Sequence, residues 1–124
     1  MFHFSKKQRL RNNKSIKEMF YHGEKLFYKP VLIVWREEVN VGVIPTRVLV
    51  TVPKKYIRHA SKRNIIRRRM KEAYRQNKHH LESVLIEKKK QLNIGIIFQD
   101  MKLTPFKLLE KKIILGLDTI KDKI

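Results

Sequence analysis

Apolar residues spaced by three and four positions predict a short helix near the start of the chain. The residues that share one face of this helix are Ile16, Met19 and Phe20. An asparagine, Asn12 or Asn13, caps its start, and Gly23 supplies a left-handed residue at its end.

Short runs rich in β-branched and aromatic residues predict three strands, over 31–36, 48–52 and 93–99. Residues 40–46 form a turn between the first two strands. Within that turn, Val41–Ile44 is an alternative short strand of its own.

The segment 58–75 predicts a long helix with two contrasting faces. At about 100° per residue, Ile66, Met70 and Ala73 fall on one side of it. The polar side carries Asn64, Arg68, Lys71 and Arg75, with Arg63 and Arg67 on its flank. Such a helix buries a thin apolar stripe and presents a broad cationic face, whose self-repulsion a polyanion would relieve.

Two further helical patterns follow the basic helix. Residues 77–91 repeat apolar residues at helical spacing (Leu81, Val84, Leu85) and either extend that helix or form a separate one. Thr104 and Pro105 open the last helix as a hydroxyl cap and a first-turn proline, and it runs to about Asp118 or beyond. Its expected buried stripe is Leu109, Ile113, Leu117 and Ile120. The order of elements predicts an α+β fold, a two-layer sandwich with a single sheet.

Charge narrows the choice of partner. The 124 residues hold 30 Lys and Arg against 11 Asp and Glu, a formal net charge of +19. That excess indicates a nucleic acid first and an anionic membrane surface second. We find neither a signal peptide nor an apolar run long enough to cross a bilayer, and the cations extend from end to end, so no membrane partner is expected.

Length and composition predict one RNA-binding domain, 1–124, in which residues 1–12 form a basic arm. The absence of cysteine excludes disulfides and thiolate metal sites, and it is typical of a protein in the reducing cytoplasm.

The sequence offers little for catalysis by the protein itself. Its acidic residues are scattered, and the one adjacent pair, Glu37 and Glu38, would point to opposite faces of a strand. His79 and His80 lie in a polar stretch and are expected to be solvated. A Gly-rich phosphate loop, a nucleophile elbow and metal-ligand spacing are all missing. We therefore predict no catalytic residue, assign no metal site, and disfavour an autonomous nuclease.

Three features have a plain structural interpretation beside a functional one. The run Arg67–Arg69 is either a solvated charged face or a binding surface, and only Glu72 is near enough in sequence to neutralise it. Ile16 and Phe20 are either ordinary core or a place where an unpaired base stacks. The pair Lys54–Lys55 either belongs to a turn or directs ammonium groups at phosphates.

The run Thr51-Val52-Pro53-Lys54-Lys55, followed by Lys62-Arg63-Asn64 and the cationic residues up to Arg75, resembles the bacterial ribonuclease P protein component. The resemblance covers nearly the whole chain, from Arg9-Leu10 to the last helix. It implies an α+β fold like that of the second domain of ribosomal protein S5, with a left-handed crossover that places the basic helix.

The resemblance also implies a function. The family's protein joins a catalytic RNA to remove the 5′ leader from precursor tRNA, and the RNA performs the hydrolysis with magnesium ions and no organic cofactor. The endoribonuclease is thus the holoenzyme, and the protein is not catalytic alone. In this family the leader lies in a cleft between the first helix and the sheet, while the basic helix lies against the catalytic RNA near its metal ions.

Pattern and resemblance together give a set of expected site residues. Those expected to bind RNA are Arg63, Asn64, Arg67, Arg68, Lys71, Arg75, Lys54 and Lys55, and those expected in the leader cleft are Ile16 and Phe20. The chain departs from the family pattern at Ile65, which replaces the second Arg of an Arg-Asn-Arg signature. It departs also at Arg69, where an aliphatic residue is common, at Ile16, which replaces a second cleft aromatic, and at Pro53, which removes a backbone donor.

The alternative function is that of a ribosomal or other structural RNA-binding protein without a processing role, since one fold hosts many functions. That hypothesis predicts tight binding to ribosomal RNA and no stimulation of tRNA processing.

Overall fold

The described part of the chain, residues 9–10, 12–38 and 44–124 of the computed structural model, forms four helices and one four-stranded sheet. In chain order the elements are α1 (Asn13–His22), β1 (Glu24–Tyr28), β2 (Val31–Glu38), β3 (Thr46–Thr51), α2 (Ala60–Asn77), α3 (His79–Lys88), β4 (Gln91–Phe98) and α4 (Phe106–Lys123). The predicted α+β class with a single sheet is confirmed.

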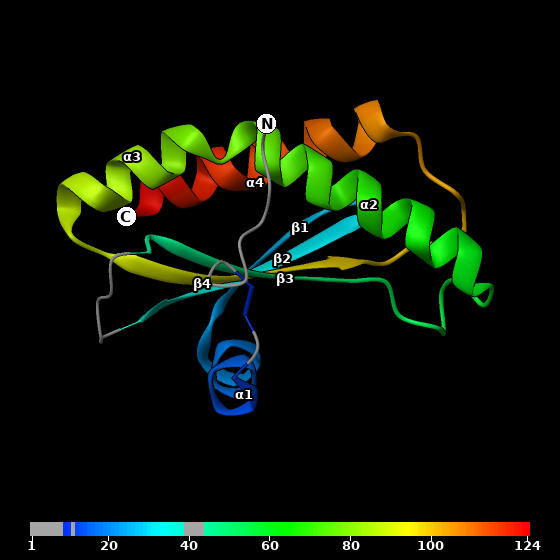
Figure 1. The fold of residues 1–124 in the computed structure, drawn as a ribbon, viewed down its shortest axis with the longest axis horizontal. Coiled ribbons are helices and arrows are strands. Elements are labelled where there is room, and N and C mark those ends of the chain that lie inside the picture. Colours follow the sequence, from blue (N-terminus) through cyan, green and yellow to red (C-terminus); the bar gives the residue numbers. More distant parts are fainter. Residues whose placement is uncertain (1–8, 11, 39–43) are drawn as a thin grey trace.

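The strands lie in the order β1-β2-β4-β3. The pairs β1–β2 and β2–β4 are antiparallel, whereas β3 runs parallel to β4. Because parallel neighbours need a crossover connection, the chain passes from β3 over one face of the sheet through α2 and α3 before it enters β4. Figure 1 shows α2, α3 and α4 on this face and α1 alone on the other.

The first helix begins as predicted and ends differently. The side-chain oxygen of Asn12 accepts hydrogen bonds from the main-chain N–H of Lys14 (2.9 Å) and Ser15 (3.3 Å), which makes Asn12 the cap. The prediction of a left-handed Gly23 is wrong, because its φ is −73° and the chain turns directly into β1. Glycine is needed there for space, since a Cβ would clash with the carbonyl oxygen of Met19 and would lie 2.8 Å from that of Trp35.

The strand predictions hold with shifted ends, and one strand was missed. The predicted ranges 31–36, 48–52 and 93–99 correspond to β2, β3 and β4, while β1 had no predicted counterpart. Of the alternative strand Val41–Ile44, residues 41–43 lie outside the described residues, and Ile44 belongs to no strand.

The segment after the basic helix is a helix of its own. Lys78 separates α2 from α3, and α3 ends at Lys89, whose φ of 56° is left-handed. The N–H of Lys90 then donates to the carbonyl of Leu85 at 2.9 Å, which closes the helix end.

The last helix begins at Phe106, one residue after Pro105. The predicted cap is wrong, because Pro105 and not Thr104 occupies the capping position and no side chain caps the helix. The hydroxyl of Thr104 instead donates to the carbonyl of Lys102 (3.1 Å). The predicted stripe is confirmed, with Leu109, Ile113, Leu117 and Ile120 all buried. Within the described residues, none of the helices is long and apolar enough to cross a membrane.

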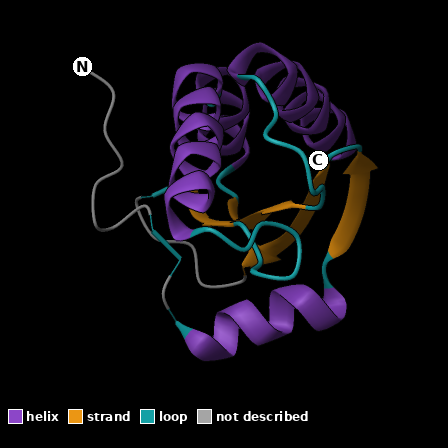
Figure 2. Cartoon of the chain, turned by 90° about the vertical axis from the view of Figure 1, so that its right-hand side faces the viewer, coloured by secondary structure: helices purple, strands orange, loops and turns teal. Residues whose placement is uncertain are grey.

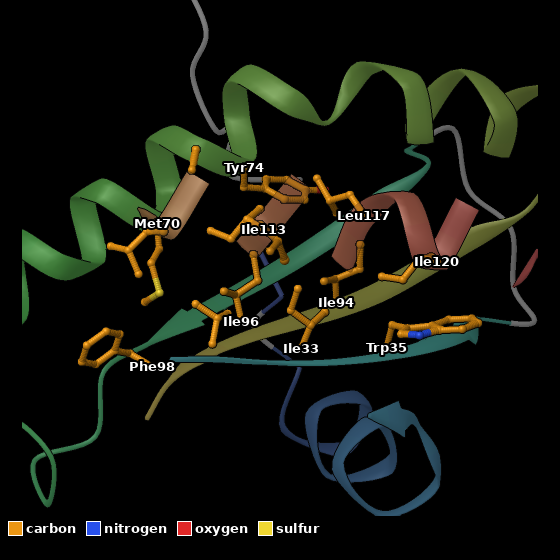
Figure 3. Close-up of a cluster of buried hydrophobic side chains, with 14 of the residues drawn as sticks. Ile33, Trp35, Met70, Tyr74, Ile94, Ile96, Phe98, Ile113, Leu117 and Ile120 are labelled. Atoms are coloured by element: carbon orange, nitrogen blue, oxygen red, sulfur yellow. The ribbon is translucent and has the colours of Figure 1, made fainter. Parts of the chain in front are cut away.

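The main core fills the space between the sheet and the helices α2, α3 and α4 (Figure 3). The apolar stripe predicted for the basic helix, Ile66, Met70 and Ala73, is buried in it. Beside that stripe, the hydroxyl of Tyr74 donates to Thr46 Oγ1 at 2.7 Å, which joins α2 to the start of β3. Burial raises the pKa of Tyr74, so its phenol stays protonated.

A second, smaller cluster lies on the opposite face of the sheet and holds α1 there. Its buried members are Leu10, Met19, Val34 and Ile97. Gly95 of β4 allows the close approach of this helix, because a Cβ at that position would lie 2.8 Å from the terminal methyl of Met19. Figure 2 shows α1 as a separate layer below the sheet.

Candidate functional site

An apolar surface runs beside α1 on the face of the sheet away from the main core. It consists of Ile16 and Phe20 from α1 and of Leu32 and Leu49 from the sheet, all half-buried against the small cluster. We call these four residues the α1-side strip. Both residues that were predicted to contact a leader therefore come together on it, and Phe20 is only half-buried there.

The cationic face of α2 is the second surface. Asn64 and Arg68 are exposed, whereas the other predicted cations of this helix are half-buried. The guanidinium of Arg67 donates to Asn64 Oδ1 at 2.7 Å, so these two side chains are held side by side. An exposed Arg68 next to that pair suits contact with phosphate oxygens.

Arg63 has a structural task on this helix. Its Nη1 donates to the carbonyl oxygens of Ile57 (3.0 Å) and Arg58 (2.6 Å). These bonds hold the segment that precedes α2. Some donors of the Arg63 guanidinium therefore bind the protein's own backbone, and its charge stays close to that segment.

A group of three cations lies where α2 approaches the edge of the sheet. Burial first, and then the charges of Arg9 and Arg67, lower the pKa of Lys71. Arg9 reaches this place because it forms an isolated parallel bridge with Val48 of β3, beside the hydrogen bond from Leu10 N to the Val48 carbonyl (3.0 Å). Three mutually repelling cations favour an anion between them.

Arg75 differs from the other predicted cations. It forms an ion pair with Glu72, which also accepts a hydrogen bond from Gln76 Nε2 at 2.7 Å. The Arg75 side chain is only 20% exposed. Its charge is thus balanced within the helix, and of the predicted residues it offers least to a ligand.

The unusual Arg69 also serves the fold. Its Nη1 donates to the main-chain carbonyl of Thr104 at 2.8 Å, so it ties α2 to the connection between β4 and α4. The charge that replaces an aliphatic residue at this position is directed towards the protein's own backbone.

A small pocket of about 240 Å³ lies at the start of α2. Its lining residues are Lys55, Tyr56, Ile57, Arg58, His59, Lys62 and Met101. His59, the residue before the helix, makes no side-chain cap, and the first turn holds no acidic residue. Free N–H groups at a helix start add to the surrounding cations, so the pocket suits a phosphate group. Lys54 is exposed in the adjoining turn.

Several residues of these surfaces were missing from the predicted set. Arg9 was assigned to the basic arm and to the family resemblance but not to the site, because its bridge to Val48 is a contact between distant parts of the chain. Arg58 and Lys62 stand four residues apart and line the pocket together. Their helical spacing was a usable signal, although Arg58 lies before the observed helix.

Within the described residues, no three His, Asp or Glu side chains lie close enough together to hold a metal ion. Cations, helix N–H groups and a partly exposed aromatic ring dominate these surfaces, a combination that is typical of RNA-binding proteins.

Residues 4–120 match the family model named Ribonuclease P. The chain belongs to the ribonuclease P protein family. It is 34% identical over 110 residues to the ribonuclease P protein component of Porphyromonas gingivalis, a match that covers 89% of this chain and 80% of that protein. Proteins of this family are subunits of the tRNA-processing endoribonuclease, so the resemblance seen in residues 51–75 is confirmed.

Solved structures of ribonuclease P proteins share the fold. The Staphylococcus aureus protein has a TM-score of 0.73 at 17% identity, covering 92% of this chain and 95% of its own. The Thermotoga maritima protein has a TM-score of 0.69 at 22% identity, covering 90% and 96%. At these identities the likeness concerns the arrangement of helices and strands.

Proposed function

We propose that this protein binds the catalytic RNA of ribonuclease P through the cationic face of α2 and the 5′ leader of precursor tRNA along the α1-side strip. The RNA carries out the hydrolysis, and the protein contributes affinity and position. Processing of precursor tRNA takes place in the cytoplasm, in keeping with a chain that lacks cysteine.

One observation carries this proposal, namely that the two surfaces meet at the edge strand β3. Leu49 of β3 belongs to the α1-side strip, while Thr46 of the same strand is bonded to Tyr74 of α2. Arg9 lies against Val48 between them and adds its charge to that of Lys71. A single strand of RNA can therefore place phosphates on the cations and continue with its bases on the apolar strip.

The predicted residues then divide by role. Asn64, Arg67, Arg68 and Lys71 contact RNA directly from the cationic face. Lys54 and Lys55 reach phosphates near the pocket at the start of α2. Arg63 positions that segment through its bonds to Ile57 and Arg58, and Arg75 contributes least because Glu72 balances it.

Magnesium enters the proposal through the RNA. A protein site for this ion would need several oxygen ligands close together, and the described residues do not bring three acidic or histidine side chains into one place. The protein's own contribution near the metal ions is the charge of α2.

The test is cleavage of a precursor tRNA by the catalytic RNA at low magnesium concentration, with and without this protein. We expect strong stimulation by the protein and no cleavage by the protein alone. A variant with Arg67, Arg68 and Lys71 changed to Gln should stimulate much less. The matched control changes three exposed or half-exposed lysines of α4, Lys107, Lys111 and Lys112, to Gln and should stimulate like the wild type.

Failure to stimulate an active catalytic RNA with folded protein would contradict the proposal. Equal loss in the two triple variants would show that overall charge, and not the cationic face of α2, supports the activity.

A further inference from the structure

We infer that Phe27 of β1 is a second stacking position for single-stranded RNA, at the edge of the sheet farthest from β3. The inference rests on the proposed function and extends the leader's path beyond Phe20. Phe27 is a large apolar side chain that is 56% exposed on an edge strand.

The orientation of Phe27 follows from its neighbours in β1. Leu26 packs against the main core, and the hydroxyl of Tyr28 lies 2.7 Å from Thr119 Oγ1 of α4. Both neighbours therefore face the side of the sheet that α2, α3 and α4 cover. Because successive side chains of a strand alternate, Phe27 faces the side of α1.

Strand register places Phe27 at the end of a row that crosses the whole sheet. The paired residues in this row are Thr51, Ile97, Leu32 and Phe27, one from each strand. Ile97 and Leu32 belong to the smaller apolar cluster that holds α1, so the row lies on the same face as the α1-side strip. Its other end is followed by Lys54 and Lys55.

The helix α1 follows the same direction as this row. Figure 1 shows α1 nearly end-on while the strands run across the view, so the helix crosses the strands and does not run along them. Three inter-strand spacings of about 4.8 Å make the row about 14 Å long. At a stacked spacing of roughly 3.4 Å, that length corresponds to about four nucleotides.

Two lysines and an exposed aromatic ring together indicate that the occupant is a polyanion with planar groups. Lys25 stands two residues before Phe27, hence on the same face, and is exposed. Lys29, in the turn that follows β1, is exposed as well. An exposed ring between two ammonium groups matches a base with its flanking phosphates, which is the pattern of single-strand recognition.

The experiment measures the affinity of the holoenzyme for precursor tRNAs whose leaders are shortened one nucleotide at a time. We expect Phe27→Ala to weaken binding about five- to tenfold for leaders long enough to reach β1, and not for shorter ones. Phe27→Trp should keep the wild-type affinity. The matched control is Tyr21→Ala, because Tyr21 is also aromatic and is 82% exposed on α1. It lies two positions after Met19, which faces the sheet, so Tyr21 points away from the sheet.

A second arm removes the base at the leader position where the Phe27→Ala effect first appears. The loss caused by Phe27→Ala should then vanish, because the ring has nothing to stack on. A persistent loss on the abasic leader would overturn the stacking role.

Two results would overturn the inference and leave the proposed function intact. One is a Phe27→Ala variant that follows the wild type at every leader length while the wild type gains affinity with length. The other is an equal loss at every length, which would indicate a general effect on fold or RNA binding. Wild-type affinity that does not depend on the leader at all would overturn the proposed leader path together with this extension.

Discussion

Arg69 of α2 donates a hydrogen bond of 2.8 Å to the main-chain carbonyl of Thr104, across 35 residues of sequence. Its two neighbours in the arginine run point elsewhere, since Arg67 bonds to Asn64 and Arg68 is exposed. Of three consecutive arginines, Arg67 therefore binds a neighbouring amide, Arg68 is exposed to solvent, and Arg69 binds the protein's backbone.

Changing Arg69 to Met should lower the free energy of unfolding by about 1–2 kcal/mol, because the Thr104 carbonyl loses a charged donor. The slope of RNA affinity against salt should change little, because this guanidinium is not free to contact phosphate. Urea unfolding and salt titration of RNA binding measure the two quantities. A salt slope lowered by about one, together with unchanged stability, would place Arg69 at the RNA interface.

Changing Arg68 to Gln should change the salt dependence of RNA binding and leave the free energy of unfolding nearly unaltered. Stability should stay within about 0.5 kcal/mol, since the side chain is exposed. The slope of log affinity against log salt should fall by about one for the lost phosphate contact. Lys111→Gln on α4 makes the same change of charge at another exposed position and should leave the slope unaltered. Equal slopes for wild type and Arg68→Gln would remove this residue from the interface.

Changing Phe20 to Ala should reduce the preference for leader-bearing precursor over mature tRNA by about tenfold, because one stacking partner is lost from the α1-side strip. Phe20→Tyr keeps the ring and should retain the preference. The measurement is the ratio of dissociation constants for the two RNAs. An equal loss on both would assign Phe20 to the core of the fold or to contacts with the catalytic RNA.

The pKa of Lys71 should appear in the pH dependence of stability. Burial, Arg9 and Arg67 lower this pKa below the ordinary value of 10.5, so the unfolded chain binds the proton more tightly than the folded one. The charged lysine therefore costs stability at neutral pH, and the cost disappears as pH rises through the lowered pKa towards 10.5.

We expect Lys71→Gln to be more stable than the wild type at pH 7, with a difference that shrinks as pH approaches 10.5. Lys71→Arg keeps a charge that does not titrate in this range and should show no such convergence with Gln. Urea unfolding of the three proteins across this range gives the measurement. Parallel curves for wild type and Gln would contradict the lowered pKa.

Helical periodicity predicted most of the architecture, because a buried stripe must repeat with the helix. The stripe of α4 from Leu109 to Ile120 and that of α2 from Ile66 to Ala73 are both observed. The strand β1 was missed because an edge strand buries little, and only Leu26 of its five residues packs against the main core among the apolar side chains. Leu26 and Tyr28 alternate with exposed residues in β1, and a period-2 pattern with two half-buried positions is too short to recognise.

The parts of the site that the sequence could not predict are contacts between distant segments. The bridge from Arg9 to Val48 brings the arm to the basic helix, and the bond from Arg69 to Thr104 takes one cation out of the cationic face. The Gly23 prediction failed partly for a similar reason, since the space for a Cβ is closed by the Met19 carbonyl of its own helix and also by Trp35 of β2, a contact between separate elements. The pairing of Arg75 with Glu72 was within reach of helical spacing and was underestimated.

The unequal size of the two apolar clusters bears on how such a protein can change over generations. Cohesion of the molecule depends on the large cluster beneath α2, α3 and α4, whereas four buried residues fasten α1 to the other side of the sheet. Substitutions of the half-buried residues around α1 therefore disturb the smaller cluster and leave the larger one intact. The surface that is proposed to meet the substrate is thus separate from the cluster that holds the scaffold together, so its chemistry can diverge among relatives while the scaffold stays the same.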